Sequence, residues 1–240
     1  MSALVVSDLH LDASQPQIAA QFERFLATDA RHARTLYVLG DLFEAWIGDD
    51  DPEPHKRGVI QALAATAASG VDLWFMHGNR DFLLGPDFCR AAGGRLLVDP
   101  TIVELHGRRV LLTHGDALCT DDEPYQKLRA LVRDPRWQAQ FLALSVAQRQ
   151  ALAAQARAGS RAHTGAQQPM LMDVNPAAVA AIFREAEVDT LVHGHTHRPG
   201  VYAHEVDGTA RTRIVTGDWH AQGSVLHWDA AGLSLEALAR

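Results

Sequence analysis

Three observations predict an α/β fold with a helical insertion. Apolar runs alternate with amphipathic helical segments over the first 92 residues, and short strands separated by turns follow. The stretch 123–168 is helical in composition and has no strand pattern. Strand–helix alternation favours right-handed crossovers and a largely parallel sheet. The length of 240 residues permits one substantial domain with an insertion.

The first half of the chain contains the strand–helix alternation. Apolar runs predict strands at 4–6, 36–39 and 71–76, and each run ends abruptly at a polar loop. Pro16 is expected to open the first helix, and a second helix is expected at 56–69.

The second half is expected to be richer in short strands. Strands are predicted at 96–98, 102–105, 110–112 and 190–192, with a hairpin turn at Gly107-Arg108. Asn175-Pro176 is a typical cap and first turn of a helix. Four final strands, near 201–206, 211–216, 224–228 and 233–237, are predicted to form an antiparallel meander.

Composition narrows the class of protein. The formal net charge of −7 argues against general affinity for nucleic acid. The two cysteines are too few for a disulfide framework. No apolar run approaches the roughly 20 residues of a membrane-spanning helix, and the N-terminus does not resemble a signal peptide. The insertion has seven basic and two acidic residues, so its charge of +5 contrasts with the acidic remainder.

Polar motifs follow the predicted strands at five places. The motifs are Asp8-Leu9-His10, Gly40-Asp41, Gly78-Asn79-Arg80-Asp81, His114-Gly115-Asp116 and Gly194-His195-Thr196-His197. The carboxyl ends of parallel strands open on one side of a sheet, so these side chains are expected to converge. Carboxylate, imidazole and amide oxygen together suit Mn²⁺, Fe²⁺ or Zn²⁺. A lone histidine in a loop is more often structural, but five such motifs in order favour a metal site.

These motifs resemble those of the calcineurin-like metallophosphoesterase superfamily. The resemblance implies a layered α/β/β/α sandwich and a two-metal centre. One metal would be held by Asp8, His10, Asp41 and His197. The other would be held by Asp41, Asn79, His114 and His195, with Asp41 bridging the two. Such a pair of metals generates a hydroxide and clamps the phosphoryl group under attack.

Arg80 indicates the type of phosphoester. Many phosphodiesterases of the superfamily have histidine at this place, where it protonates a poor leaving group. Arginine cannot act as a general acid near neutral pH, but it can grip phosphate with two hydrogen bonds. A phosphate leaving from a phosphoanhydride needs no such acid, so Arg80 favours pyrophosphate cleavage. The alternative is that Arg80 forms a structural ion pair at the surface.

A closer resemblance, to the UDP-2,3-diacylglucosamine diphosphatase family, covers nearly the whole chain. It rests on the segments 7–11, 37–50, 77–83, 114–126, 172–176 and 193–199. It implies hydrolysis to UMP and 2,3-diacylglucosamine 1-phosphate in lipid A biosynthesis, with two Mn²⁺ per chain and water attacking the uridine-side phosphorus. The catalytic residues implied are Asp41, Asn79, Arg80 and His114. The substrate-binding positions implied are Asn79, Arg80, Asp122, Ser160, Thr164, Gln167 and His195.

Two of those positions depart from the family pattern. Thr164 and Gln167 stand where many relatives have asparagine and lysine, so this chain lacks a positive charge that could meet phosphate. Arg157 or Arg161 would then compensate for the missing positive charge.

By the same resemblance, residues 1–122 and 169–240 form the core, and 123–168 form a helical cap. Apolar residues recur at helical spacing in the cap at Leu128, Leu131 and Val132, and at Trp137, Phe141 and Leu144. They are expected to line a slot for acyl chains, although packing of the cap onto the core is the alternative. The basic face would suit an anionic membrane surface. The expected location is the cytoplasm, peripheral to the inner face of the bacterial inner membrane, with no obligate protein partner.

Two rival hypotheses come from the same residues. A soluble nucleotide pyrophosphatase or a protein phosphatase would need a shorter, less apolar cap. A scaffold protein with an inactive phosphoesterase fold would usually lack a ligand, and all seven expected ligands are present here.

Overall fold

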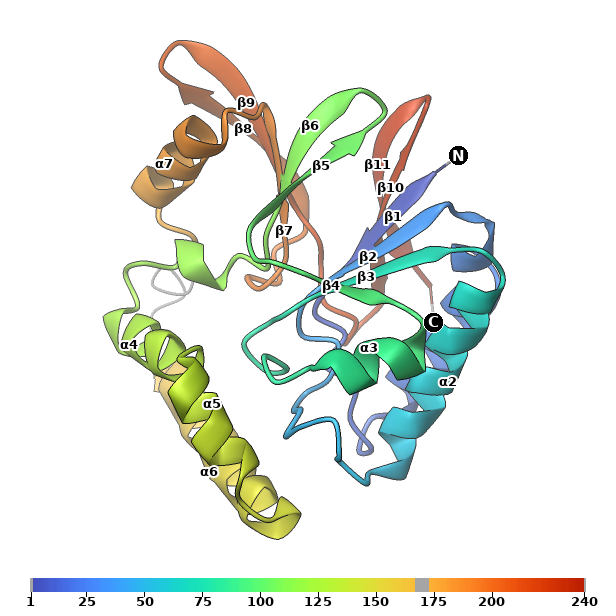
Figure 1. The fold of residues 1–240 in the computed structure, drawn as a ribbon. Coiled ribbons are helices and arrows are strands. Elements are labelled where there is room, and N and C mark those ends of the chain that lie inside the picture. Colours follow the sequence, from blue (N-terminus) through green and yellow to red (C-terminus); the bar gives the residue numbers. More distant parts are fainter. Residues whose placement is uncertain (1, 167–172, 240) are drawn as a thin grey trace.

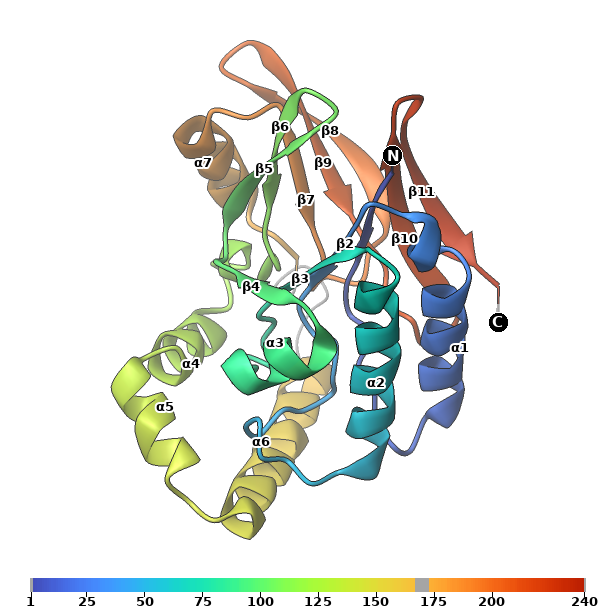
Figure 2. The ribbon, with the colours of Figure 1, turned by 45° about the vertical axis from the view of Figure 1, so that its right-hand side comes forward.

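Two sheets face each other, and helices cover both outer faces (Figure 1; Figure 2). The computed structural model describes residues 2–166 and 173–239, with side chains for all of these except 160–166. The six-stranded sheet is covered by α1 (Pro16–Ala27), α2 (Pro54–Ala68) and α3 (Pro86–Ala92). Helix α7 (Pro176–Ala186) covers the five-stranded sheet. The expected α/β/β/α sandwich is therefore confirmed.

The first sheet is mixed rather than purely parallel. Its order is β11-β10-β1-β2-β3-β4, and the four strands from β1 to β4 run parallel. The strands are β1 (Ala3–Val6), β2 (Thr35–Leu39), β3 (Asp72–Met76), β4 (Arg95–Leu97), β10 (Gly223–Asp229) and β11 (Gly232–Leu238). A 3₁₀ turn at Ala30–His32 precedes β2.

The second sheet has the order β5-β6-β7-β9-β8. Its strands are β5 (Thr101–Leu105), β6 (Arg108–Leu112), β7 (Thr190–His193), β8 (Gly200–Val206) and β9 (Thr209–Val215). The predicted meander of four final strands is wrong, because β8–β9 and β10–β11 are two hairpins in different sheets. Strand β9 pairs in parallel with β7, whereas β10 pairs with β1. Hairpins form locally, but the apolar faces that meet in the core decide which sheet a hairpin joins.

Strand β1 shows how the core is built. Alternate side chains of a strand point to opposite faces. Leu4 and Val6 pack toward the helices, and Val5 packs between the sheets with Val192 and Ile214. Both faces are buried, so the strand appears in the sequence as a continuous apolar run rather than an alternating one.

The hairpin between β5 and β6 turns one residue earlier than predicted. The turn residues are His106 and Gly107, with φ of 48° and 74°, and not Gly107-Arg108. Tight two-residue hairpin turns with positive φ at both positions match the twist of the flanking strands. Histidine at the first turn position is an uncommon choice, which is why the sequence placed the turn at the glycine.

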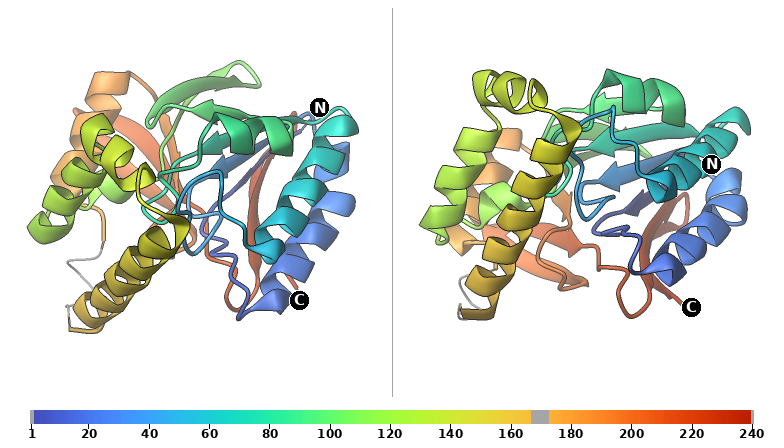
Figure 3. Two further views of the ribbon diagram at one scale, coloured as in Figure 1. Left: turned by 60° about the horizontal axis from the view of Figure 1, so that its bottom comes forward. Right: turned by 90° about the horizontal axis from the view of Figure 1, so that it is seen from below.

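Three helices stand outside the sandwich, next to the carboxyl ends of the central strands (Figures 1, 2 and 3). They are α4 (Glu123–Val132), α5 (Pro135–Leu142) and α6 (Val146–Ala166). Asp122 and Asp134 cap the first two by accepting hydrogen bonds from backbone N–H groups of the first turn. No residue of α4 or α5 is buried. Among the described residues, no helix combines the length and apolar character that crossing a membrane requires.

Candidate metal centre

The predicted ligands lie on loops that follow five strands. Asp8 and His10 follow β1, Asp41 follows β2, Asn79 follows β3, His114 follows β6, and His195 and His197 follow β7. Five of these residues have positive φ, between 50° and 67°: Asp8, His10, Asp41, His195 and His197. Residues other than glycine rarely adopt this backbone conformation, and such strained positions cluster at functional sites.

The first group of ligand atoms comes from Asp8, His10, Asp41 and His197. His10 Nε2 lies 3.2 Å from His197 Nε2 and 3.7 Å from Asp41 Oδ2. His197 Nε2 lies 3.5 Å from Asp8 Oδ1. The ligand atoms of Asp8, His10 and His197 all lie within 4.8 Å of one another, and Asp41 adjoins them through His10. We call this group of four residues centre A.

The second group, centre B, comes from Asp41, Asn79, His114 and His195. Asn79 Oδ1 lies 3.1 Å from His114 Nε2 and 3.0 Å from His195 Nδ1. His114 Nε2 lies 3.8 Å from Asp41 Oδ1. Asp41 thus presents one carboxylate oxygen to each centre, which is the arrangement of a bridging ligand.

The spacing and the donor types fit divalent cations. Ligand atoms about 2.0–2.2 Å from a metal lie roughly 3–3.5 Å from one another. Asp8 Oδ1 is buried and has no hydrogen-bond partner within the described residues, so it is available to a cation. The ligand atoms of Asp8, Asp41 and His114 also lie within 4.8 Å of one another, so the two centres adjoin.

A second layer of hydrogen bonds orients the imidazoles. His10 Nδ1 lies 3.1 Å from Glu44 Oε2, His114 Nδ1 lies 2.8 Å from the carbonyl oxygen of Leu39, and His197 Nδ1 lies 3.3 Å from Asp218 Oδ2. Each acceptor favours a proton on Nδ1 and leaves the Nε2 lone pair for the centre. The loops are held as well, because Asp81 accepts hydrogen bonds from the backbone N–H groups of Asp41, Leu42 and Gly78.

Electrostatics without cations mark the site as anionic. Burial alone would lower the pKa of His114, but the carboxylates of Asp41, Asp116 and Asp8 raise it to about 9. Burial alone would also lower the pKa of His197. The hydrogen bonds and charges of Asp218 and Asp8 outweigh burial and raise this pKa to about 10. Burial and the charge of Asp41 raise the pKa of Asp81 to about 6. The nearby carboxylates thus favour protonated His114 and His197 in the metal-free protein, and a cation would compete with these protons.

The predicted substrate-binding residues divide into four groups. Asn79 and His195 belong to centre B, and Arg80 adjoins the centres because its backbone N–H donates to Asp41 Oδ1 at 2.8 Å. The charge of Arg80 also helps to lower the pKa of Glu44, against the effect of burial. Asp122 accepts a hydrogen bond from the backbone N–H of Tyr125 at the start of α4.

The remaining predicted positions cannot be compared with the site. Ser160 and Thr164 lie on α6, with side chains outside the described part, and Gln167 lies outside the described residues.

Sequence reasoning missed several residues that support the centres. Glu44 lies inside the segment 37–50, and the resemblance of that segment to the family does not indicate a role for it. Asp218 follows β9 in a Gly-Asp pair, like Asp41, and that repeated pattern was a usable signal. Tyr125, whose ring stacks on His195 with centroids 5.9 Å apart, gave no such signal.

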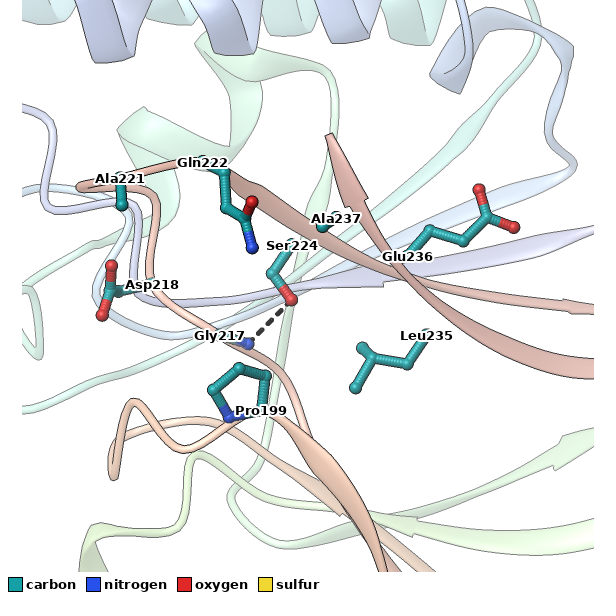
Figure 4. A pocket seen from close by; sticks show the side chains of 9 residues that line it. All are labelled: Pro199, Gly217, Asp218, Ala221, Gln222, Ser224, Leu235, Glu236 and Ala237. Atoms are coloured by element: carbon teal, nitrogen blue, oxygen red, sulfur yellow. Dashed lines mark hydrogen bonds between the residues drawn. The ribbon is translucent and has the colours of Figure 1, made fainter. Parts of the chain in front are cut away.

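A cavity of about 250 Å³ adjoins this supporting layer (Figure 4). It is lined by Gly217, Asp218, Ala221 and Gln222 together with Pro199, Ser224 and residues of β11. Ser224 Oγ accepts a hydrogen bond from the backbone N–H of Gly217 at 2.8 Å. Asp218 lines this cavity and also contacts His197, but none of the seven ligands lines it.

Comparison with known proteins gives a consistent result. Residues 1–199 match the family model described as calcineurin-like phosphoesterase. The chain is 53% identical to the UDP-2,3-diacylglucosamine hydrolase of Stenotrophomonas maltophilia (strain K279a), over 100% of both chains. It is 51% identical to the protein of that name from Xanthomonas oryzae pv. oryzae (strain PXO99A), again over 100% of both.

A solved structure shares the fold. An archaeal phosphodiesterase is similar with a TM-score of 0.50 and 14% identity, covering 99% of this chain and 100% of that chain.

Proposed function

This chain belongs to the calcineurin-like phosphoesterase family, and we propose that it hydrolyses UDP-2,3-diacylglucosamine to UMP and 2,3-diacylglucosamine 1-phosphate. The observation that carries the proposal is a full-length match to hydrolases of that substrate, combined with ligand atoms in the geometry of two metal centres. The product would serve lipid A biosynthesis.

Centres A and B would hold two divalent cations, for which we propose Mn²⁺. When bound, such a pair supplies Lewis acidity and lowers the pKa of a bound water molecule. Asp41 supplies negative charge to both positions, since its two oxygens face different centres. Centre A has two carboxylates, Asp8 and Asp41, whereas centre B has Asp41 alone. Centre B would therefore be less anionic than centre A.

Arg80 would bind the diphosphate. Its backbone is fixed by Asp41, and its guanidinium can form two parallel hydrogen bonds to a phosphoryl oxygen pair. The leaving group is a phosphomonoester with a second pKa of about 6, so it departs without a proton donor. The residues near the centres thus match cleavage of a phosphoanhydride better than cleavage of an alkyl phosphodiester.

Residues 123–168 would form the cap over the lipid, on a core of residues 1–122 and 169–240. Trp137 stacks on Phe141 with ring centroids 5.1 Å apart. The ring centroid of Phe82, a core residue, lies 6.1 Å from that of Trp137. Leu128 and Leu131 of α4 are each 52% exposed and are available to acyl chains. His195 and Asp122, together with Ser160, Thr164 and Gln167 of the cap, are the proposed headgroup contacts.

The lipid substrate would bring the protein to the cytoplasmic face of the inner membrane. Part of the expected basic face is not available there. Arg129, Arg133 and Arg149 are bound to acidic groups or carbonyl oxygens of the core, and Arg157 lies 3.9 Å from Asp12. Lys127 is 78% exposed, and its side chain pairs with the exposed Glu123 on the same helix.

The test compares three substrates with Mn²⁺ present. Turnover of UDP-2,3-diacylglucosamine in detergent micelles is expected to exceed that of UDP-glucose and bis(p-nitrophenyl) phosphate by at least about 100-fold, because apolar burial of the acyl chains contributes to transition-state binding. Equal or faster turnover of UDP-glucose would instead indicate a soluble nucleotide pyrophosphatase. Product analysis by mass spectrometry in ¹⁸O-water should place the label in UMP.

A further inference from the structure

Helix α4 of the proposed cap is joined directly to the loops that carry the ligands of centre B. Tyr125 Oη donates to Asp116 Oδ2 at 2.5 Å, and Gln126 Nε2 donates to the carbonyl oxygen of Asp116 at 2.8 Å. Asp116 lies two residues after the ligand His114. The first turn of α4 therefore binds the loop of a ligand, although no residue of the helix is buried.

Arg129 lies at the centre of this contact, between two buried carboxylates. Its Nε donates to Asp116 Oδ2 at 2.8 Å, and its Nη2 lies 3.7 Å from Asp99 Oδ2. The side chain of Asp116 is 0% exposed, and that of Asp99 is 6% exposed. Buried carboxylates without a counter-charge are costly, so Arg129 holds both of them in place.

Asp99 continues the connection to the ligand. Its Oδ1 accepts hydrogen bonds from Thr113 Oγ1 at 2.5 Å and from the backbone N–H of His114 at 3.3 Å. Arg129 therefore reaches His114 from both sides, through Asp99 before the ligand loop and Asp116 after it.

Two further contacts of α4 reach the other ligands of centre B. Arg133 Nη2 donates to the carbonyl oxygen of Gly78 at 3.0 Å, next to Asn79, and lies 4.0 Å from Asp116. The ring of Tyr125 stacks on His195 with an interplanar angle of 27°. By contrast, the supporting hydrogen bonds of His10 and His197 lead to Glu44 and Asp218 of the core loops.

We propose that Arg129 is a positioning residue for centre B, which it orients through Asp99 and Asp116, so that the cap governs one of the two metal positions and leaves the other to the core. The inference rests on the proposed function for the identity of centre B as a metal site. It assigns α4 a role in metal binding in addition to any contact with the lipid.

The test measures metal binding in the full-length protein, without substrate. Arg129→Gln should weaken one of the two Mn²⁺ sites by about 10- to 100-fold in isothermal titration, with the other site within twofold of the wild type. At equal Mn²⁺ concentration, electron paramagnetic resonance should show the exchange-coupled pair replaced by isolated Mn²⁺.

Two further variants serve as comparisons. Arg129→Lys retains the charge but not the double contact, so its Mn²⁺ affinity should lie between those of the wild type and Arg129→Gln. Lys127→Gln, two residues away and at a side chain that pairs with the exposed Glu123, should bind both ions like the wild type.

Specific results would overturn the inference. They are wild-type affinity at both sites in Arg129→Gln, or equal weakening of both sites that parallels a loss of helical signal and of the thermal midpoint. A wild-type protein that binds two Mn²⁺ but does not hydrolyse UDP-2,3-diacylglucosamine would instead refute the proposed function, and the positioning role of Arg129 would stand.

Discussion

The metal centres and the three outer helices are held by different kinds of interaction. Asp8 and His114 are 0% exposed and Asp41 is 2% exposed, and each is fixed by hydrogen bonds to buried loops. Helices α4 and α5 contain no buried residue. The difference places preorganised charge on the rigid sheet edges, while the part proposed to meet a variable lipid is attached through a few polar and aromatic contacts.

Within the described residues, such contacts attach the outer helices at several places. Besides the contacts of α4 at centre B, the rings of Phe82 and Trp137 lie tilted with centroids 6.1 Å apart. Arg149 of α6 is 2% exposed and donates to Asp50 Oδ1 and to the carbonyl oxygen of Ile47. The expectation that Trp137 and Phe141 line a slot therefore competes with a packing role: Phe141 packs partly buried against the core cluster.

Asp41→Asn should give the largest effect. The substitution preserves shape but removes the charge shared by both centres, so kcat/KM is expected to fall on the order of 10³-fold or more. Steady-state kinetics and metal analysis together test this. Asp87→Asn, at an exposed acid paired with Arg90, is the matched control and should leave kcat/KM and the bound metal unchanged. Activity above a tenth of wild type in Asp41→Asn would contradict a bridging role.

Metal binding should release protons. With the pKa of His114 raised to about 9 and that of His197 to about 10, both are protonated at pH 7.5 without metal, and cations must displace these protons. Overall affinity for the metal pair should rise about 100-fold per pH unit below pH 9, at two protons released. Isothermal titration in buffers of different ionisation enthalpy measures the number of protons released.

The same shifts predict the opposite trend for stability of the metal-free protein. A pKa raised on folding stabilises the native state below the unfolded value of about 6.5, and this contribution is lost as pH rises through 9 to 10. Urea unfolding at pH 6 and pH 10 checks the sign. An apparent heat of metal binding that is independent of the buffer would contradict both expectations.

Arg149→Met should loosen the outer helices without changing the centres. Loss of its charged hydrogen bonds to Asp50 and the Ile47 carbonyl is expected to cost about 2 kcal/mol in the free energy of unfolding. Urea denaturation measures this, and Lys127→Met, whose ion pair is exposed, should cost about 0.5 kcal/mol or less.

Gly48→Ala tests the same attachment of Arg149 from the side of the core. A Cβ on Gly48 would lie 2.5 Å from Arg149 Nη1, whereas one on Gly70 would meet nothing within 4 Å, although both glycines have positive φ. Greater destabilisation of Gly48→Ala than of Gly70→Ala is therefore expected. Equal losses would show that backbone strain alone matters there.

Trp137→Ala should have the smallest effect and the most selective one. Its ring lies beside Phe82 and Phe141 at the proposed slot. Loss of its apolar contact with an acyl chain would cost about 1.4 kcal/mol, so KM for the lipid substrate is expected to rise about tenfold. Mn²⁺ affinity should not change. An equal loss of kcat/KM with UDP-glucose would show that Trp137 supports the core rather than the lipid slot.

Local patterns predicted the parts that depend on local chemistry. Apolar runs located β1, β2 and β3, and Asn175 caps α7 through hydrogen bonds to two backbone N–H groups as expected. The same patterns did not predict that β8–β9 and β10–β11 join different sheets, since pairing across the sandwich depends on contacts far apart in sequence. Nor did they show that Arg129, Arg133 and Arg149 point into the molecule.

The sequence by itself predicted the seven candidate ligands, because their polar motifs follow apolar strands and resemble those of a known family. Only the tertiary structure decided that Asp41 directs one oxygen to each centre, and that Glu44, Asp218 and Arg129 support them. Metal coordination requires particular donor types, which a sequence displays. Orientation of those donors requires any well-placed hydrogen-bonding group, and its placement arises only when distant segments pack together.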